Sequence, residues 1–87
     1  ITSEAVIETG VHLYRNVTLG TKNGGAPHIK PHAKIASHAV VLGPVVVGER
    51  AIVGAGAVVV EDVPAEKIAV GVPARVIGDA TEAAYQF

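Results

Sequence analysis

Aliphatic residues recur every six positions along most of this chain. The recurring residues on the two sides of an interrupting loop are Ile1, Ile7, Leu13 and Leu19, then Ile29, Ile35, Val41, Val47, Val53 and Val59. A second, smaller residue follows most of them by four positions, as in Ala33, Ala39, Val45, Ala51, Ala57 and Val63. An α-helix repeats near 3.6 residues and an amphipathic strand near 2, so neither explains this period.

A period of six with one large and one small inward residue is typical of a parallel β-helix in which three units form a triangular coil. Such coils stack at the strand spacing of ~4.8 Å. Small residues suit the crowded corners, and we expect Gly43, Gly48, Gly54 and Gly56 to permit tight turns with positive φ. We therefore predict an all-β fold, a single-stranded β-helix of a little over three coils across residues 1–64. The alternative is an antiparallel sandwich of valine-rich strands, whose turns would not keep a strict frame.

The stretch "VTLGTKNGGAPHIK" interrupts the frame. Leu19 and Ile29 are ten residues apart, so residues 20–28 contain a four-residue insertion into a six-residue repeat. A glycine-rich basic loop at a fixed place in a regular scaffold is a candidate binding element.

The frame ends near Pro64, and prolines there and at position 73 are expected to stop ladder pairing. We predict that residues 65–87 form a C-terminal cap and tail of the same domain, which spans 1–87. The closing "DATEAAYQF" predicts a short helix with Asp79 as its N-cap and Glu82 three residues later.

Composition limits the classes of function. The net charge of -1 argues against a nucleic-acid-binding protein, and no apolar run reaches the ~20 residues that span a bilayer. Cysteine is absent, which fits a reducing compartment, so we expect a cytoplasmic location. With one Phe, two Tyr and no Trp, the core must consist of small aliphatic residues, and a domain this small favours oligomerisation. The chain begins at Ile1 and contains no methionine, so we expect a fragment or a processed chain.

Two segments of the chain carry a family resemblance. "AVIETGVHLYRNVTLG" with its loop, and "VGAGAVVVEDVPAEKIAVGVPARVIG", resemble the C-terminal catalytic domain of the serine acetyltransferases, up to about Gly78. The resemblance implies a left-handed β-helix, a homotrimer that binds acetyl-CoA between neighbouring subunits, and acetyl transfer to serine or a similar hydroxyl acceptor.

The resemblance also implies a histidine as general base. In the family that histidine lies in an Asp-His-Ala-Thr-Gly segment, which would precede Ile1, so the domain is expected to be N-terminally truncated. A second family histidine precedes the proline of the loop, where this chain has Ala26. His28 is the remaining catalytic candidate, and the alternative is a solvent-facing loop histidine. Without the family histidines, an inactive form is an open alternative.

The positions that correspond to the family's cofactor site are small or basic. The resemblance implies that pantetheine amides meet the backbone at Gly20, Thr21, Ser37 and Ala55. Lys22 and Arg75 are the candidates for contacts with phosphate groups, which prefer charged donors.

Other polar residues give no site. The four histidines, His12, His28, His32 and His38, have spacings of sixteen, four and six, and the close pair five residues apart of hexapeptide-type carbonic anhydrases is missing, so we expect no metal. Five acidic residues form no recognisable pair for acid–base catalysis, namely Glu8, Glu49, Glu61, Asp62 and Glu66.

Two other functions remain open from the sequence. One is a sugar or polysaccharide O-acetyltransferase, and the other is a non-catalytic trimerising scaffold. Family tails that end in isoleucine dock into the enzyme that makes cysteine, whereas this chain ends in Phe87, so we do not expect that partner.

Overall fold

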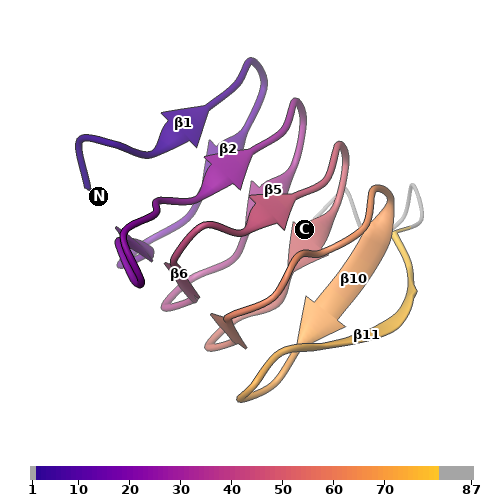
Figure 1. The fold of residues 1–87 in the computed structure, drawn as a ribbon. Helices are drawn as coiled ribbons and strands as arrows, with labels where there is room; N and C mark the ends of the chain where they lie inside the picture. The colour runs from indigo at the N-terminus through magenta and orange to yellow at the C-terminus, as the bar shows by residue number, and fades with distance from the viewer. Residues whose placement is uncertain (1, 81–87) are drawn as a thin grey trace.

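The chain winds into stacked triangular coils, with each strand beside its counterpart in the next coil (Figure 1). The computed structural model describes residues 2–80, and every regular element found there is a β-strand. Face A comprises β1 (Val6–Ile7), β4 (His28–Ile29) and β7 (Val46–Val47). Face B comprises β2 (His12–Leu13), β5 (Lys34–Ile35), β8 (Ile52–Val53) and β10 (Lys67–Val70). Face C comprises β3 (Thr18–Gly20), β6 (Val40–Leu42) and β9 (Val58–Val59). No helix long and apolar enough to cross a membrane occurs in the described part of the chain.

Strand register confirms the six-residue frame and the insertion. Neighbouring coils pair in parallel, and Ile35 lies opposite Val53, which is three six-residue units further along the chain. Across the loop, Leu13 lies opposite Ile35, so the same step takes three units and four additional residues. These four residues are the predicted insertion within 20–28.

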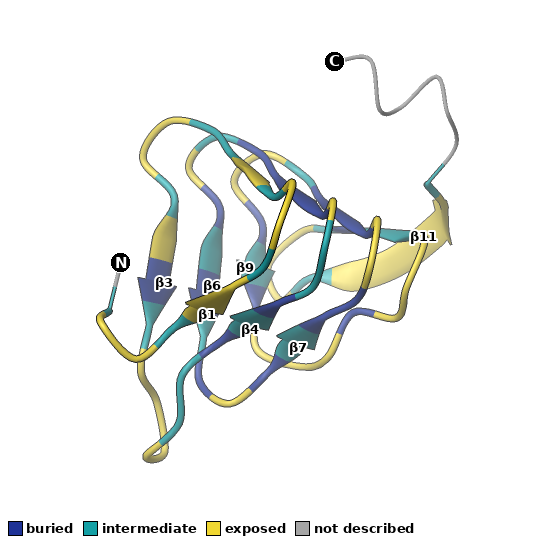
Figure 2. Ribbon diagram, turned by 90° about the horizontal axis from the view of Figure 1, so that it is seen from above, coloured by how far each residue is buried: buried dark blue, intermediate teal, exposed yellow. Residues whose placement is uncertain are grey.

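The inward aliphatic residues form the core (Figure 2). The large members are at most 1% exposed, namely Leu19, Ile29, Ile35, Val41, Val47, Val53 and Val59. The small residues four positions later are buried beside them, as expected where the coil turns. The fold is thus an all-β parallel β-helix of three complete coils and most of a fourth.

The fourth coil is two residues shorter than the coils before it. Val47 lies opposite Val63 and Val53 lies opposite Ala69, and each step falls two residues short of three six-residue units. Val63 therefore occupies the large inward position, not the small one that the frame predicts. The prediction that Pro64 ends the ladder is wrong, because the shortened coil carries Pro64 into a corner and β10 then adds a rung to face B.

The last described strand reverses direction. β11 (Arg75–Asp79) pairs antiparallel with β10 and lies at the end of face B. Asp79 is the last residue of this strand and forms an ion pair with Lys67. The remainder of the predicted helix, residues 81–87, lies outside the described residues.

Left-handed backbone occurs at all three corners: at the corner where the chain leaves face C it is Gly43, with φ 84°, and at the other two corners it falls on one repeat position. The third residue after the inward aliphatic residue has φ between 57° and 72° at Gly10, Asn16, His32, His38, Arg50, Gly56 and Glu66. The two histidines share one repeat position and lie at different corners, because they belong to successive six-residue units. Each closes its turn by donating its backbone N–H to the coil before it, so backbone geometry accounts for their placement.

Gly48 and Gly54 serve a different purpose from the predicted one, since neither has positive φ. A Cβ at Gly48 would lie 2.6 Å from Ala65 Cα, and a Cβ at Gly54 would lie 2.6 Å from Val70 Cγ1. Glycine is needed here because the next coil passes too close for a side chain.

We expect Gly48→Ala to lower the free energy of unfolding by about 1–3 kcal/mol, because backbone atoms of Ala65 must move. Gly56→Ala is the control for conformation alone, because nothing lies within 4 Å of its Cβ. Denaturant unfolding of the asparagine variants separates the two causes. Asparagine tolerates the left-handed region, so it should improve on alanine at Gly56 but not at Gly48. Equal rescue at both positions would contradict this interpretation.

Candidate functional site

The inserted loop is a short hairpin that leaves the coil after face C. Lys22 and Gly25 exchange two backbone hydrogen bonds of 3.0 and 3.1 Å. Between them, Asn23 has φ 52° and Gly24 has φ 78°. Positive φ at both central residues defines a type I′ turn, for which Asn-Gly is the preferred sequence. The turn residues therefore fix the shape of the loop and present Lys22 at its base.

Four of the predicted cofactor residues lie along the two borders of face C. Ser37 and Ala55 are at equivalent positions of successive coils, at the corner where the chain enters this face, and the Ser37 carbonyl accepts the N–H of Gly56. Gly20 ends β3 and pairs with Leu42, and Thr21 follows it toward the loop.

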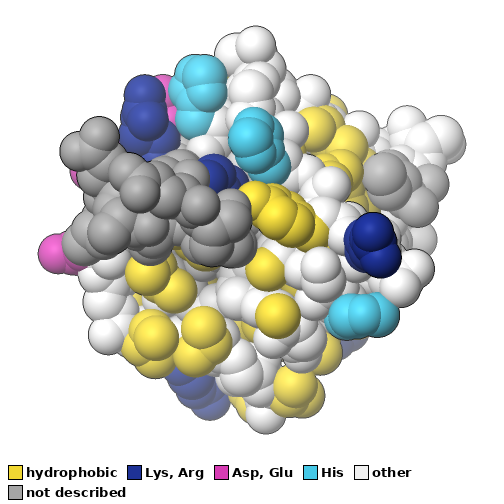
Figure 3. All heavy atoms as spheres, turned by 180° about the vertical axis from the view of Figure 1, so that it is seen from behind, with side chains coloured by type: hydrophobic (Ala, Val, Ile, Leu, Met, Phe, Trp, Pro, Cys, Tyr) yellow, Lys and Arg dark blue, Asp and Glu magenta, His cyan; other side chains and the backbone are white. Residues whose placement is uncertain are grey.

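The outward surface of face C is uncharged and largely apolar. Strand alternation turns the neighbours of the buried residues outward, and on this face they are Thr18, Gly20, Val40, Leu42, Val58 and Val60. None of them is charged, and Val60 is 37% exposed. Figure 3 shows the molecule from behind, with hydrophobic side chains gathered in the lower half of the view.

The two predicted phosphate-binding cations border the same face but do not meet. Lys22 lies against Gly43 at the corner where the chain leaves face C. Arg75 follows Ala74, whose N–H donates to the Val58 carbonyl at the far end of face C. The Arg75 guanidinium lies 3.5 Å from the Glu61 carboxylate, and both side chains are more than two-thirds exposed. Such a pair is weak, so the guanidinium can exchange this partner for a ligand.

His28 is not a loop histidine but part of β4 on face A. Its Nε2 contacts Oε2 of Glu8, a residue of the preceding coil. Each of the two side chains is 36% exposed, so the pair is partly open to water. A histidine fixed by a carboxylate is an arrangement that general-base catalysis uses.

Sequence analysis missed Glu8 as a partner, although a signal for it was present. One coil plus the insertion carries the chain from Val6 to His28, so these two residues lie opposite each other. Glu8 follows Val6 by two residues, and side chains two apart in a strand point to the same side of the sheet. Glu8 therefore faces the same side as His28. The pair could have been predicted by adding the four inserted residues to the length of one coil, because this sum places Val6 opposite His28.

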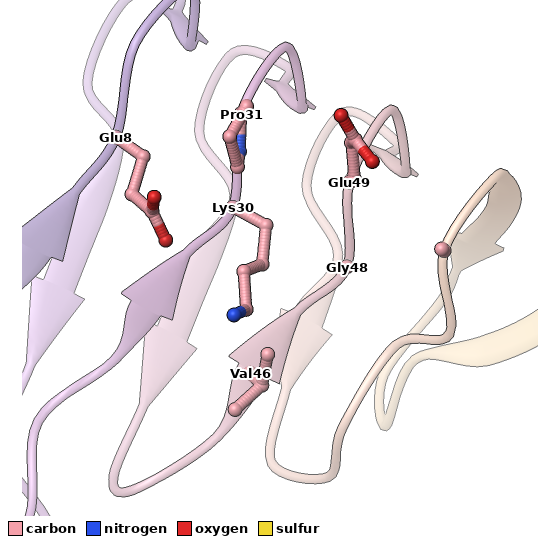
Figure 4. Close-up of a pocket in the computed structure, with 7 residues that line it drawn as sticks. Glu8, Lys30, Pro31, Val46, Gly48 and Glu49 are labelled. Atoms are coloured by element: carbon pink, nitrogen blue, oxygen red, sulfur yellow. The ribbon is translucent and has the colours of Figure 1, made fainter.

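A shallow pocket of about 390 Å³ lies beside this pair on face A (Figure 4). Its wall comprises Glu8, Lys30, Pro31, Val46, Gly48, Glu49 and Ala65. The Lys30 side chain extends toward Val46, and among residues 2–80 its ammonium group has no ion-pair partner. The pocket thus contains a lysine ammonium without an ion-pair partner, and the carboxylates of Glu8 and Glu49 come from the coils before and after that of Lys30.

The remaining histidines do not join this site. His12 lies on face B, and His32 and His38 lie at corners. Within residues 2–80, no three His, Asp or Glu side chains are grouped so that they could hold a metal ion.

Comparison of the sequence with protein families gives a match between residues 26–61 and the bacterial transferase hexapeptide (six repeats) model. A putative serine acetyltransferase of Schizosaccharomyces pombe is 47% identical over 78 residues, and a serine acetyltransferase of Escherichia coli K12 is 45% identical over 78 residues. Each match covers 85% of this chain but 29% of the relative. The chain therefore spans less than a third of the length of these curated relatives.

Solved structures agree with the sequence comparison. The serine acetyltransferase of Brucella abortus strain S19, in complex with coenzyme A, superimposes with a TM-score of 0.87 at 34% identity. The match covers 92% of this chain and 34% of that one. It confirms the predicted left-handed β-helix.

Proposed function

Because this chain belongs to the serine acetyltransferase-like hexapeptide-repeat acyltransferases, we propose that it transfers an acetyl group from acetyl-CoA to the hydroxyl of serine or a similar small acceptor. The observation that carries this proposal is the arrangement of face C. Its uncharged outward surface is bordered by every predicted cofactor residue and lies next to the face that holds His28 and Glu8.

Face C fits the pantetheine arm of acetyl-CoA. The arm is thin and its two amides need backbone partners, which small residues such as Gly20, Ser37 and Ala55 leave accessible. At the borders, Lys22 and Arg75 supply charge-assisted donors for the phosphate groups. Related enzymes solved with coenzyme A support the same choice of cosubstrate.

His28 acts as the general base in this proposal. It removes the proton of the acceptor hydroxyl while the oxygen attacks the thioester carbonyl, and coenzyme A then leaves as the thiol. Backbone N–H groups of the coil are candidates to stabilise the negative oxygen of the tetrahedral intermediate.

The pocket on face A is the proposed place of the acceptor. An α-amino acid such as serine carries a carboxylate that the Lys30 ammonium can pair with, and its ammonium group can approach Glu49. Lys30 and Glu49 line the pocket together with Glu8, which is the contact partner of His28.

A homotrimer is the proposed assembly, and the cytoplasm is the proposed location. Large hydrophobic side chains are exposed on the described chain, including Val60 at 37%, Val72 at 72% and Ile77 at 66%. Such residues favour association when they gather, and a core built almost entirely of small aliphatic side chains benefits from it. The absence of cysteine supports a reducing compartment.

Calorimetric titration with acetyl-CoA, with the molar mass measured in the same buffer, tests these proposals. We expect a trimer that binds one acetyl-CoA per subunit and releases free thiol when serine is added. A folded trimer that ignores acetyl-CoA would favour the scaffold alternative. A chain that stays monomeric at micromolar concentration would contradict the proposed assembly.

Neutralising the two cations that border face C tests where the cosubstrate binds. We expect Lys22→Gln and Arg75→Gln each to raise the Kd of acetyl-CoA about tenfold, since one charged hydrogen bond is worth about 1.5 kcal/mol or more. Lys67→Gln is the matched control, because Lys67 pairs with Asp79 on face B. If all three substitutions weaken binding equally, net charge and not position accounts for the effect.

A further inference from the structure

We propose that residues 81–87 bind across the outward surface of face B. This inference goes beyond the proposed function and does not depend on it. It starts from three residues of the face, Lys34, Ala36 and Ile52, which are only 7%, 6% and 2% exposed. Each is the neighbour of a large inward residue, so strand alternation turns it away from the coil interior. Neither Ala36 nor Ile52 belongs to the core cluster that the inward residues form.

The six-residue repeat supplies controls for this burial. Lys34 and Ile52 each come directly before a large inward residue, in two successive coils. On the other two faces of the same coils, the equivalent positions are only half-buried, namely His28, Val40, Val46 and Val58. Stacking of neighbouring coils is common to all these positions, so it does not explain the deeper burial on face B. A further layer of chain must cover this face.

No strand between residues 2 and 80 forms that layer. Every described strand belongs to one of the three walls of the coil. β11 extends the wall of face B beyond β10, and all five of its residues are exposed (Figure 2), so it does not fold back over the face. The turn that joins β10 to β11 is bonded to face C, through the carbonyl of Gly71 and the N–H of Ala74. The cover must therefore come from outside the described residues.

The described chain ends beside face B. The Ala80 N–H donates to the Glu66 carbonyl at 2.8 Å, and Glu66 directly precedes β10 of this face. Seven residues follow Ala80, and an extended segment of that length reaches about 23 Å. The distance from β10 to β5 is two strand spacings, or about 10 Å. Residues 81–87 therefore start near enough and reach far enough to cover Lys34 and Ile52.

The segment also carries the side chains that such a surface binds. Its sequence, TEAAYQF, contains two of the three aromatic residues of the chain, Tyr85 and Phe87. Aromatic rings pack well against isoleucine and alanine, and against the aliphatic stem of a lysine, whose ammonium they attract. A lysine is almost never this deeply buried unless its charge is paired, and Glu82 can supply the carboxylate.

Acylation of individual lysines tests whether face B is covered. The full chain is treated with acetic anhydride, and mass spectrometry of its peptides gives the rate at each lysine. We expect Lys34 to react about tenfold more slowly than Lys30, the half-buried lysine of face A in the same coil, because burying one large apolar side chain shifts an opening equilibrium by at least that factor. Equal rates at the two lysines would overturn the proposal.

Substitutions within the segment test what covers the face. In the double variant with Tyr85→Ser and Phe87→Ser, the rate at Lys34 should rise about tenfold, while the rate at Lys30 stays unchanged. Val72→Ser is the matched control, because it removes an apolar side chain that is 72% exposed and lies in the turn bonded to face C. It should leave both rates as in the wild type.

The remaining outcome identifies a different occupant. If Lys34 stays slow in the double variant, residues 81–87 are not the cover and the proposal is wrong. A second copy of the chain is then the occupant if dilution raises the rate at Lys34, because association depends on protein concentration. The rates are measured without acetyl-CoA or serine, so they stand apart from any test of the proposed function.

Discussion

His28→Ala is expected to lower kcat for acetyl transfer by about 10²- to 10⁴-fold, the usual contribution of a general base. Binding of acetyl-CoA should be unchanged, because the residues proposed to hold it border face C while His28 lies on face A. Thiol release under saturating acetyl-CoA and serine measures the first quantity, and calorimetry measures the second.

The matched control is His12→Ala. His12 is an exposed histidine of β2 on face B, and its loss removes the same chemical group without touching the pair of His28 and Glu8. If His28→Ala keeps the wild-type kcat, the base is a different group and the assignment of His28 is wrong.

The coil architecture could be predicted from the sequence because one repeat position recurs in every coil. Ile29, Ile35 and Val41 each point inward on a different face, and the β-helix that the period indicates has three such units per coil, as the strand register shows. The four-residue insertion could also be predicted, because Leu19 and Ile29 continue the six-residue repeat on either side of it.

The end of the β-helix could not be predicted from the same pattern. Val63 fits the small inward position by its spacing from Val59 and the large inward position by its size. Only strand register shows that it lies opposite Val47. The requirement for glycine at position 48 follows from this shortening, because Ala65 then passes close to it.

Part of the candidate site could likewise be predicted from the sequence, and part could not. Gly20, Ser37 and Ala55 could be assigned from the resemblance, because backbone contacts depend on position more than on side chain. The pair of His28 and Glu8 depends on two side chains 20 residues apart. It becomes visible only when the insertion is added to the coil length, since the repeat alone places Glu8 opposite a loop residue.

Truncation of one core residue is expected to have the largest effect on stability. Ile35 is fully buried on β5 between Leu13 and Val53 of the neighbouring coils. Ile35→Ala should lower the free energy of unfolding by about 2–5 kcal/mol, which combines lost burial with the cavity that rigid neighbours leave behind. Since domains of this size are stable by about 5–15 kcal/mol, the variant should unfold at much lower denaturant concentration.

Ile77→Ala makes the same chemical change at a position that is 66% exposed, so its effect should lie within about 0.5 kcal/mol. Both variants are compared at one protein concentration, because association shifts apparent stability. If Ile77→Ala proves as destabilising as Ile35→Ala, the exposed side chain must be buried in an assembly, and repeating the comparison at lower concentration should then separate the two. If Ile35→Ala unfolds like the wild type, the column of inward aliphatic residues is not what stabilises the coils.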